Sequence, residues 1–353
     1  MYLLIYIAPY NSINVLYDPK RPAPDRVVKV STVRLPPPAF IDNYENVWPQ
    51  VFNEIKLSLD LKAPAKVFVN IHPQSLWFNS IDMDRSCKKI SPKDSFCDMN
   101  IPFMYFGEEQ FYSPLGAYDF EVSPQDVSKW FEFGESLSSI EDFWGNRSFY
   151  GAKPARGAWE VAFNEAILRE KVFRAMELFS QSLLKDVEEL YLSGEVLYGY
   201  SNLAELLLMV LNSANVPGAW TLFLDKDSIL GPVSALLGVD KDNVLSFLKE
   251  HQFLCMSHIF VVPEVPRAQV TSSDNITQAL TLKKEGLFLV PPAADDVEVS
   301  VKVGKEAFEK SLSPSSLGIV FDTRKRPLGI PDSRVERLKL RDLLRKQISN
   351  WEV

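Results

Sequence analysis

Cysteine and histidine are both scarce in this sequence, which has three residues of each type among 353. The cysteines are Cys87, Cys97 and Cys255. An odd and scattered set of cysteines does not form a disulfide framework. A reducing compartment is the simpler interpretation, so we expect a cytoplasmic protein.

One cluster of these residues has a spacing that could suit a metal ion. His251, Cys255 and His258 lie close together in the chain. The pattern changes from helix to strand near Phe253, however, which would separate the three side chains. No fourth ligand is close in sequence, so we expect neither a metal nor any other cofactor.

Long apolar runs and an excess of basic residues are also missing. No run reaches the roughly 20 apolar residues of a membrane helix, and the apolar residues 1–7 lack a basic flank and stop before Pro9. We therefore expect neither a membrane span nor a signal peptide. The formal net charge of −8 argues against generic binding to nucleic acid.

Familiar catalytic signatures are absent from the sequence as well. It contains no GxxxxGK[ST], GxGxxG, HExxH or GxSxG motif. The composition, 46% hydrophobic and 24% charged, is nevertheless that of a globular protein. A chain of 353 residues is long enough for two domains.

The hydrophobic pattern predicts strands and helices in alternation. Apolar runs at residues 3–7 and 13–17 flank a turn and predict a hairpin. A second hairpin is expected at 66–71 and 76–81, and residues 83–125 have no clear pattern. Helical spacing predicts helices over 47–61, 158–184, 202–211, 242–250 and 334–351, and the region after residue 253 is rich in β-branched runs.

Five motifs in the second half of the chain occur together in one known family. They are residues 141–147 (EDFWGNR), 165–170 (EAILRE), 192–197 (LSGEVL), 224–238 (which begins LDKDSIL and ends ALLG) and 317–331 (LGIVFDTRKRPLGIP). In order and spacing they resemble the MutL/GlmL family, which accompanies adenosylcobalamin-dependent glutamate mutase. That family belongs to the ASKHA superfamily of actin, sugar kinases and Hsp70, so the resemblance implies an α/β, actin-like fold of two lobes.

The resemblance also implies where a nucleotide should bind. ASKHA ATPases hold phosphates with two hairpin turns that need an aspartate and glycines, because backbone N–H groups must approach the phosphate oxygens. The first turn here has Tyr6 at the aspartate position, Ala8 at a glycine position, and then Pro9.

The two remaining nucleotide motifs depart from the family pattern too. Asn70 replaces the aspartate of the second turn, and His72 and Pro73 replace its glycines. The adenosine turn keeps Gly194 but follows it with Glu195, whose carboxylate would repel a polyphosphate. We therefore predict a degenerate nucleotide site.

These substitutions predict a non-catalytic scaffold or regulatory subunit that binds a protein partner, such as an intact ASKHA relative. The predicted parts are a reduced first lobe (1–130), a second lobe (131–252) and a β-rich C-terminal region (253–353). An ATP-driven chaperone that reactivates a cobalamin-dependent mutase is an alternative that the resemblance implies.

The C-terminal stretch supplies a third hypothesis. Residues 324–346 contain nine lysines and arginines against three acidic residues. A solvated helix face is the simpler interpretation. A contact for an acidic partner or nucleic acid is the alternative, with Arg337, Arg341, Arg345 and Trp351 as its candidate residues.

Overall fold

The structure is a computed structural model that describes most of the chain. The described residues are 1–36, 41, 43–61, 66–71, 75, 77–78, 81, 87–97, 99, 101–107, 110–119, 122–131, 133, 135–150, 157–182, 187–197, 200, 202–215, 217–251, 253–262, 267–272, 277–282, 286–303, 306–326, 328 and 333–349. No helix within these ranges combines the length and apolarity needed to cross a membrane.

The N-terminal residues form a five-stranded sheet in the order β3-β2-β1-β4-β5. Its strands are β1 (Tyr2–Ile7), β2 (Asn11–Tyr17), β3 (Val27–Arg34), β4 (Lys66–Ile71) and β5 (Cys87–Ile90). The first three form an antiparallel meander, and β4 and β5 join in parallel. Alternate residues of β1 face opposite sides, so Leu3 and Ile5 pack against α1 (Tyr44–Ser58), while Leu4 and Tyr6 face the rest of the molecule.

An eight-stranded second sheet repeats this topology. Its order is β14-β17-β11-β10-β9-β6-β7-β8. The strands are β6 (Phe103–Phe106), β7 (Gln110–Ser113), β8 (Gly116–Asp119), β9 (Glu189–Ser193), β10 (Gly218–Leu224), β11 (Leu254–Val261), β14 (Leu287–Val290) and β17 (Ile319–Asp322). The meander β6-β7-β8 with the parallel strands β9 and β10 has the order and directions of β1 to β5. This duplication defines the two-lobed, actin-like α/β fold and confirms the predicted fold class.

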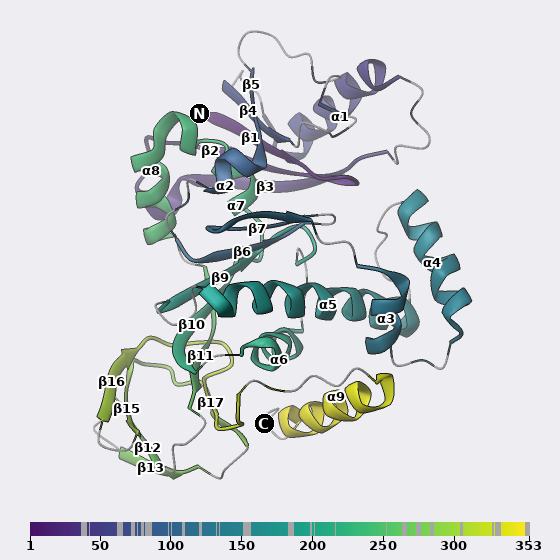
Figure 1. Ribbon diagram of the computed structural model, residues 1–353. Helices are drawn as coiled ribbons and strands as arrows, with labels where there is room; N and C mark the ends of the chain where they lie inside the picture. The colour runs from purple at the N-terminus through teal and green to yellow at the C-terminus, as the bar shows by residue number, and fades with distance from the viewer. Residues whose placement is uncertain are drawn as a thin grey trace.

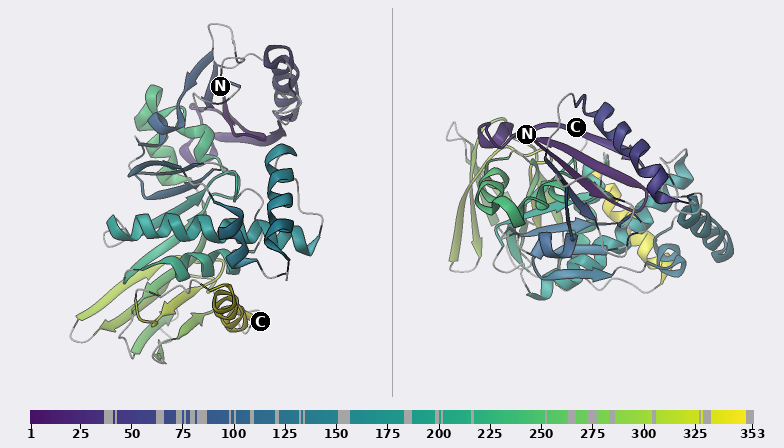
Figure 2. Two further views of the ribbon diagram at one scale, coloured as in Figure 1. Left: turned by 45° about the vertical axis from the view of Figure 1, so that its right-hand side comes forward. Right: turned by 90° about the horizontal axis from the view of Figure 1, so that it is seen from above.

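Helices cover the second sheet and fill the space between the lobes (Figure 1). They are α2 (Pro92–Cys97), α3 (Pro124–Trp130), α4 (Leu137–Tyr150), α5 (Ala158–Ser182), α6 (Leu203–Ser213), α7 (Leu230–Ser234), α8 (Leu237–Glu250) and α9 (Arg334–Ser349), with the short 3-10 helix η1 (Ala23–Asp25) in the first lobe. α5 and α6 bury an apolar face against the second sheet. The left view in Figure 2 agrees with Figure 1 in placing α9 beyond α5 and α6, at the far end of the molecule from the first sheet.

A third, antiparallel sheet is inserted between β11 and β17. It has the order β13-β12-β15-β16, with strands β12 (Arg267–Ser272), β13 (Thr277–Thr281), β15 (Val297–Val303) and β16 (Glu306–Leu312). It packs against Phe260 and Phe321 of the second sheet. The prediction of a β-rich region after residue 253 is confirmed.

Two predictions about the N-terminal half are wrong. The expected return strand at 76–81 is not found among the described residues of that stretch, where Trp77 and Phe78 form a turn, and β4 pairs in parallel with β1 and β5. Residues 83–125, which lack a clear pattern, contain β5 to β8 and α2. β6 to β8, which precede residue 130, bond into the second sheet.

Candidate functional site

Three turns of the actin-like fold lie where the two lobes meet. In the first lobe, the N–H of Ala8 donates to the carbonyl of Asn11 at 2.9 Å and closes the β1–β2 turn. In the second, the N–H of Gly107 donates to the carbonyl of Gln110 at 2.8 Å and closes the β6–β7 turn. The second hairpin is therefore β6–β7, and the assignment of Asn70 to it was wrong; His72 and Pro73 lie outside the described residues.

Gly194 begins the third turn, which follows β9. Its backbone φ of +127° is one that residues with a side chain rarely adopt. A Cβ at this position would lie 2.2 Å from the carbonyl oxygen of Phe106, so glycine is required for β9 to approach β6 this closely. The next residue, Glu195, is 8% exposed, and its Oε1 lies close to Gly107.

The space between these turns holds α7 and two tyrosine rings. Tyr6 and Tyr105 meet edge to face with ring centroids 5.3 Å apart. A Cβ on Gly231 of α7 would lie 2.6 Å from the Tyr105 hydroxyl oxygen and 3.1 Å from the Tyr6 ring. Asn70 Nδ2 donates to the carbonyl of Gly231 at 2.9 Å and to Ser234 Oγ at 2.6 Å, which fixes α7 to the first sheet.

The structure thus brings together several of the residues singled out in the sequence. Tyr6, Ala8 and Asn70 lie on the side of the first lobe that faces the second lobe, and Gly194 and Glu195 lie on the second lobe. Pro9 is half-buried in its turn. Burial, followed by the nearby Tyr6 and Glu195, raises the pKa of Tyr105 well above its usual value of 10.0. Whether this arrangement is a degenerate nucleotide site stays a prediction.

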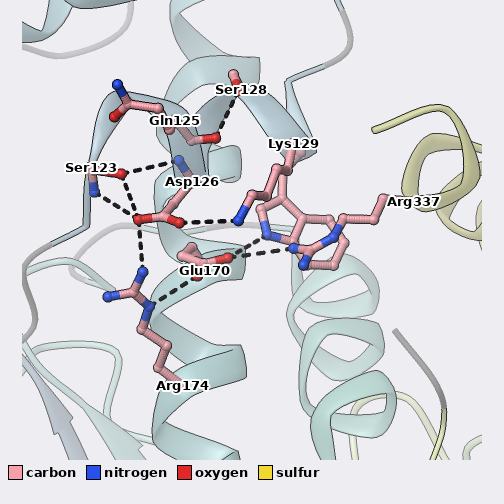
Figure 3. Close-up of polar contacts among 9 residues, drawn as sticks. Ser123, Gln125, Asp126, Ser128, Lys129, Glu170, Arg174 and Arg337 are labelled. Atoms are coloured by element: carbon pink, nitrogen blue, oxygen red, sulfur yellow. Dashed lines mark hydrogen bonds and ion pairs between the residues drawn. The ribbon is translucent and has the colours of Figure 1, made fainter. Parts of the chain in front are cut away.

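The arginines proposed for partner binding face inward. Arg337 of α9 lies over the Trp130 ring at 4.6 Å and 3.6 Å from the Glu170 carboxylate. Figure 3 shows this contact beside Asp126 and Arg174. Both Arg337 and Arg341 are buried (5% and 7% exposed).

Arg345 and Arg341 complete the inward stripe of α9. Arg345 donates to Glu205 at 3.1 Å and to Glu165 at 3.0 Å. Arg341 lies 2.7 Å from Asp342. Arg337 and Arg341 are therefore not part of a solvated helix face, and Arg337 and Arg345 join α9 to α5 and α6. Partner binding by these arginines stays a prediction, and Trp351 lies outside the described residues.

A cavity of about 1190 Å³ lies on the face of the second sheet that α5 and α6 leave open. It is lined by Ile101, Pro102, Glu189, Tyr191, Phe223, Leu224, Asp225, Lys226, Asp227, Leu248, His251, Phe253, Leu254, Cys255, Ser313, Pro314, Ser315 and Ser316. We call it the α8 pocket, because Leu248 of α8 and His251, directly after it, form one wall. Its residues come from β9, β10, α8, β11 and the loop before β17.

Aromatic rings form much of the pocket wall. Tyr191 and Phe223 stack with centroids 4.9 Å apart and an interplanar angle of 13°. Phe253 meets Tyr191 edge to face at 5.3 Å, and His251 meets Phe253 at 4.7 Å. Burial lowers the pKa of His251, with Asp227 acting in the opposite direction, so its imidazole is neutral at pH 7.

Carboxylates surround these rings. Glu189 and Asp227 are exposed at the rim, and Glu189 Oε2 accepts a 2.7 Å hydrogen bond from the Tyr191 hydroxyl. Asp225 is 2% exposed at the base. Lys226 is the pocket-lining residue with a positive charge at pH 7. The pocket is therefore acidic and aromatic.

Asp225 also ties the pocket to α7. Its carboxylate accepts hydrogen bonds from Ser193 Oγ at 2.6 Å and from the N–H groups of Ile229 and Leu230 at 3.0 and 2.9 Å. Burial raises the pKa of this carboxyl to about 6, although these hydrogen bonds act in the opposite direction.

In the cysteine–histidine cluster seen in the sequence, Cys255 Sγ lies 3.9 Å from His258 Nε2, so these two side chains stay together. His251 and Cys255 line the pocket, whereas the His258 ring bonds Thr221 Oγ1 at 3.0 Å and the carbonyl of Ser313 at 2.7 Å. Burial, and then Glu189, raises the pKa of Cys255 to about 11, so it is a thiol at neutral pH. In the described part of the chain, no group of three metal-ligating side chains could hold a metal ion.

Comparison with known proteins gives matches among solved structures only. No protein-family model and no curated protein matches the chain. One matching structure is a ROK family protein from Streptococcus pneumoniae TIGR4 in complex with sucrose, with a TM-score of 0.36 and 7% identity over 68% of this chain and 99% of that one. Another is the Lmo2764 protein of Listeria monocytogenes, described provisionally as an N-acetylmannosamine kinase, with a TM-score of 0.33 and 9% identity over 70% and 99%.

These matches correct the sequence-based hypothesis about function. The matches do not single out the MutL/GlmL family named from the sequence. A match described as a kinase contradicts the predicted non-catalytic scaffold and pseudo-ATPase, and neither is taken further. The mutase chaperone and the nucleic-acid hypothesis are not supported either, and the protein partner stays a prediction.

Proposed function

We propose that this protein binds a small aromatic cation in the α8 pocket. The observation that carries the proposal is the combination of stacked rings with carboxylates in one cavity. Binding pockets for small molecules typically enclose about 300–1,000 Å³ and combine apolar walls with a few polar groups. At about 1190 Å³, the α8 pocket is large enough for such a ligand.

The lining selects for ring systems and for positive charge. Tyr191, Phe223 and Phe253 offer π surfaces, which attract both other rings and cations. Glu189 and Asp227 place negative charge at the entrance, and a recess with low-dielectric walls concentrates that field. An anion would have to approach both carboxylates, and among the described residues that line the pocket only Lys226 would offset them.

Three simple probes of similar size test this ligand class: benzylamine, benzyl alcohol and benzoate. Isothermal titration is expected to give a dissociation constant on the order of 1 mM for benzylamine. Benzyl alcohol should bind roughly tenfold more weakly, because it keeps the ring and loses the charge. Benzoate should not bind measurably.

Two variants assign the binding to the pocket. Glu189→Gln should weaken the binding of benzylamine and leave the binding of benzyl alcohol unchanged, while Phe223→Ala should weaken the binding of both. Glu54→Gln is the matched control, because Glu54 is exposed on α1 in the other lobe. Binding of benzoate as tight as that of benzylamine, or no binding of benzylamine at about 10 mM, would overturn the proposal.

A further inference from the structure

We infer, on the basis of the ligand site proposed above, that occupation of the α8 pocket is coupled to the docking of the first lobe. The coupling element is the chain between β10 and β11, residues 225–251, which we call the bridging segment. It contains α7 and α8. Its ends form pocket walls, and its middle packs on the first sheet.

The packing of the bridging segment on the first lobe is extensive. Its side chains share one apolar core with residues of β1, β2 and β4, and with β6 and β7 of the second sheet. The bridging members are Ile229, Leu230, Val233, Ala235, Leu236, Leu237, Val244, Phe247 and Leu248, and the first-lobe members include Leu4, Tyr6, Ile13, Val15, Tyr17 and Phe68. A shift of the first lobe would therefore carry the bridging segment with it.

Polar contacts hold the same interface. Arg26 Nη1, at the end of η1, donates to the carbonyl of Asn243 in α8 at 2.7 Å. At the other helix, Asn70 of β4 bonds Gly231 and Ser234 of α7. Both helices of the bridging segment are thus hydrogen-bonded to the first lobe.

An aromatic series leads from that interface into the pocket. Tyr17 of β2 meets Phe247 edge to face at 5.6 Å, and Phe247 contacts His251 at 4.8 Å. His251 contacts Phe253, which packs on Tyr191 in the pocket. A change in the angle of α8 against β2 therefore repositions a ring that lines the pocket.

The other end of the bridging segment is fixed by Asp225. This pocket residue accepts bonds from Ser193 on β9 and from the first N–H groups of α7. Ser228 Oγ adds a bond to the carbonyl of Gly194 at 2.7 Å. The turn that forms one pocket wall thus also positions α7 against Tyr6 and Tyr105.

Because the pocket and the lobe interface share this segment, a ligand that fits one arrangement of the walls favours one arrangement of the lobes. Such coupling is reciprocal. A change that loosens the contact between the lobes must weaken ligand binding, and ligand binding must stabilise that contact. Both directions can be measured with benzylamine as the probe.

The first direction uses a change outside the pocket. Arg26→Ala removes the bond to Asn243 and should weaken benzylamine binding by up to about fivefold, the factor that corresponds to one hydrogen bond of about 1 kcal/mol. Arg21→Ala is the matched control. Arg21 is an exposed arginine of the same loop, its side chain pairs with Asp18, and it should leave the dissociation constant unchanged.

The second direction needs no variant, so it applies even if Arg26→Ala does not fold. Hydrogen exchange of the β2 amides, measured with and without saturating benzylamine, should slow at least twofold in the wild type and stay unchanged in Glu189→Gln. Benzylamine could bind without changing either readout, that is, with the same dissociation constant in Arg26→Ala and the same hydrogen exchange rate of the β2 amides. The proposed coupling would then be wrong, and the proposed ligand site would stand. If benzylamine fails to bind, both proposals fall.

Discussion

Replacing Glu170 by glutamine removes one negative charge from a point where three donors converge. Glu170 accepts hydrogen bonds from Trp130 Nε1 at 2.7 Å and from Arg174 Nε at 2.9 Å, and it lies 3.6 Å from Arg337 (Figure 3). Glutamine has nearly the same volume and can still accept the Trp130 bond. The variant therefore tests charge and not packing.

The expected cost follows from what each arginine keeps. The Arg174 side chain is 31% exposed and keeps its ion pair with Asp126 at 2.7 Å, so its guanidinium loses little electrostatic stabilisation. Arg337 is 6% exposed and loses a counter-charge. Removing one partner of a buried pair typically costs about 3–5 kcal/mol, and the cation–π contact with Trp130 offsets about 1 kcal/mol. We expect Glu170→Gln to lower the free energy of unfolding by about 2–4 kcal/mol.

Urea unfolding followed by tryptophan fluorescence measures this loss, with coincident far-UV circular dichroism to check for intermediates. Glu336→Gln, an exposed position on α9, is the control and should change stability by less than about 0.5 kcal/mol. In the double variant Glu170→Gln/Arg337→Met, methionine can cover Trp130 without a charge. It should be more stable than Glu170→Gln alone. Additive losses in the double variant would refute the assignment of the effect to Arg337.

Two further changes test the lobe interface. Because burial raises the pKa of Asp225 to about 6 from 3.8, the folded chain holds a proton that the unfolded chain releases between these values. The free energy of unfolding should therefore fall by roughly 3 kcal/mol as pH rises from about 4 to 7, and Asp225→Asn should remove this component. The free energy is measured by urea unfolding at each pH, and the same fall with pH in both proteins would contradict the assignment to Asp225. Gly194→Ala should destabilise by at least about 3 kcal/mol because its Cβ meets the Phe106 backbone, whereas Gly145→Ala in α4, with nothing within 4 Å, should stabilise by up to about 1 kcal/mol, both measured as unfolding midpoints.

Elements with a clear period were predictable from the sequence. The expected helices at 158–184 and 202–211 correspond to α5 and α6, and the Asn202 side chain caps α6 by accepting from the Glu205 N–H at 3.1 Å. The first hairpin is β1–β2. Each of these has a local signal, in the spacing of apolar residues or in a cap, that does not depend on distant parts of the chain.

The strands of the second meander have no such signal. β6 reads FMYF and is buried on both faces, so it lacks the alternation that marks a half-buried strand. β7 and β8 are only four residues long. The second hairpin was placed at β4 instead, because a buried strand followed by turn-forming residues looks the same whether its neighbour runs parallel or antiparallel.

The α8 pocket could not be predicted from the sequence either, although two of its residues have a metal-like spacing. His251 and Cys255 share a pocket wall with Tyr191 and Phe223 in the structure. Tyr191, Phe223 and Cys255 are register neighbours on β9, β10 and β11, and the bridging segment places His251 beside them. No motif of fixed spacing can encode such a site.

The basic C-terminal helix shows how a charge pattern can be seen correctly and still be misinterpreted. Arg337, Arg341 and Arg345 recur every four residues, and this spacing places them on one face of α9. That face meets Glu170, Glu165 and Glu205, acidic residues of α5 and α6 that share those helices with long apolar stretches. The carboxylates that meet an arginine stripe can therefore belong to the same chain. Here α5 and α6 supply the carboxylates, and these ion pairs hold α9 against the second lobe.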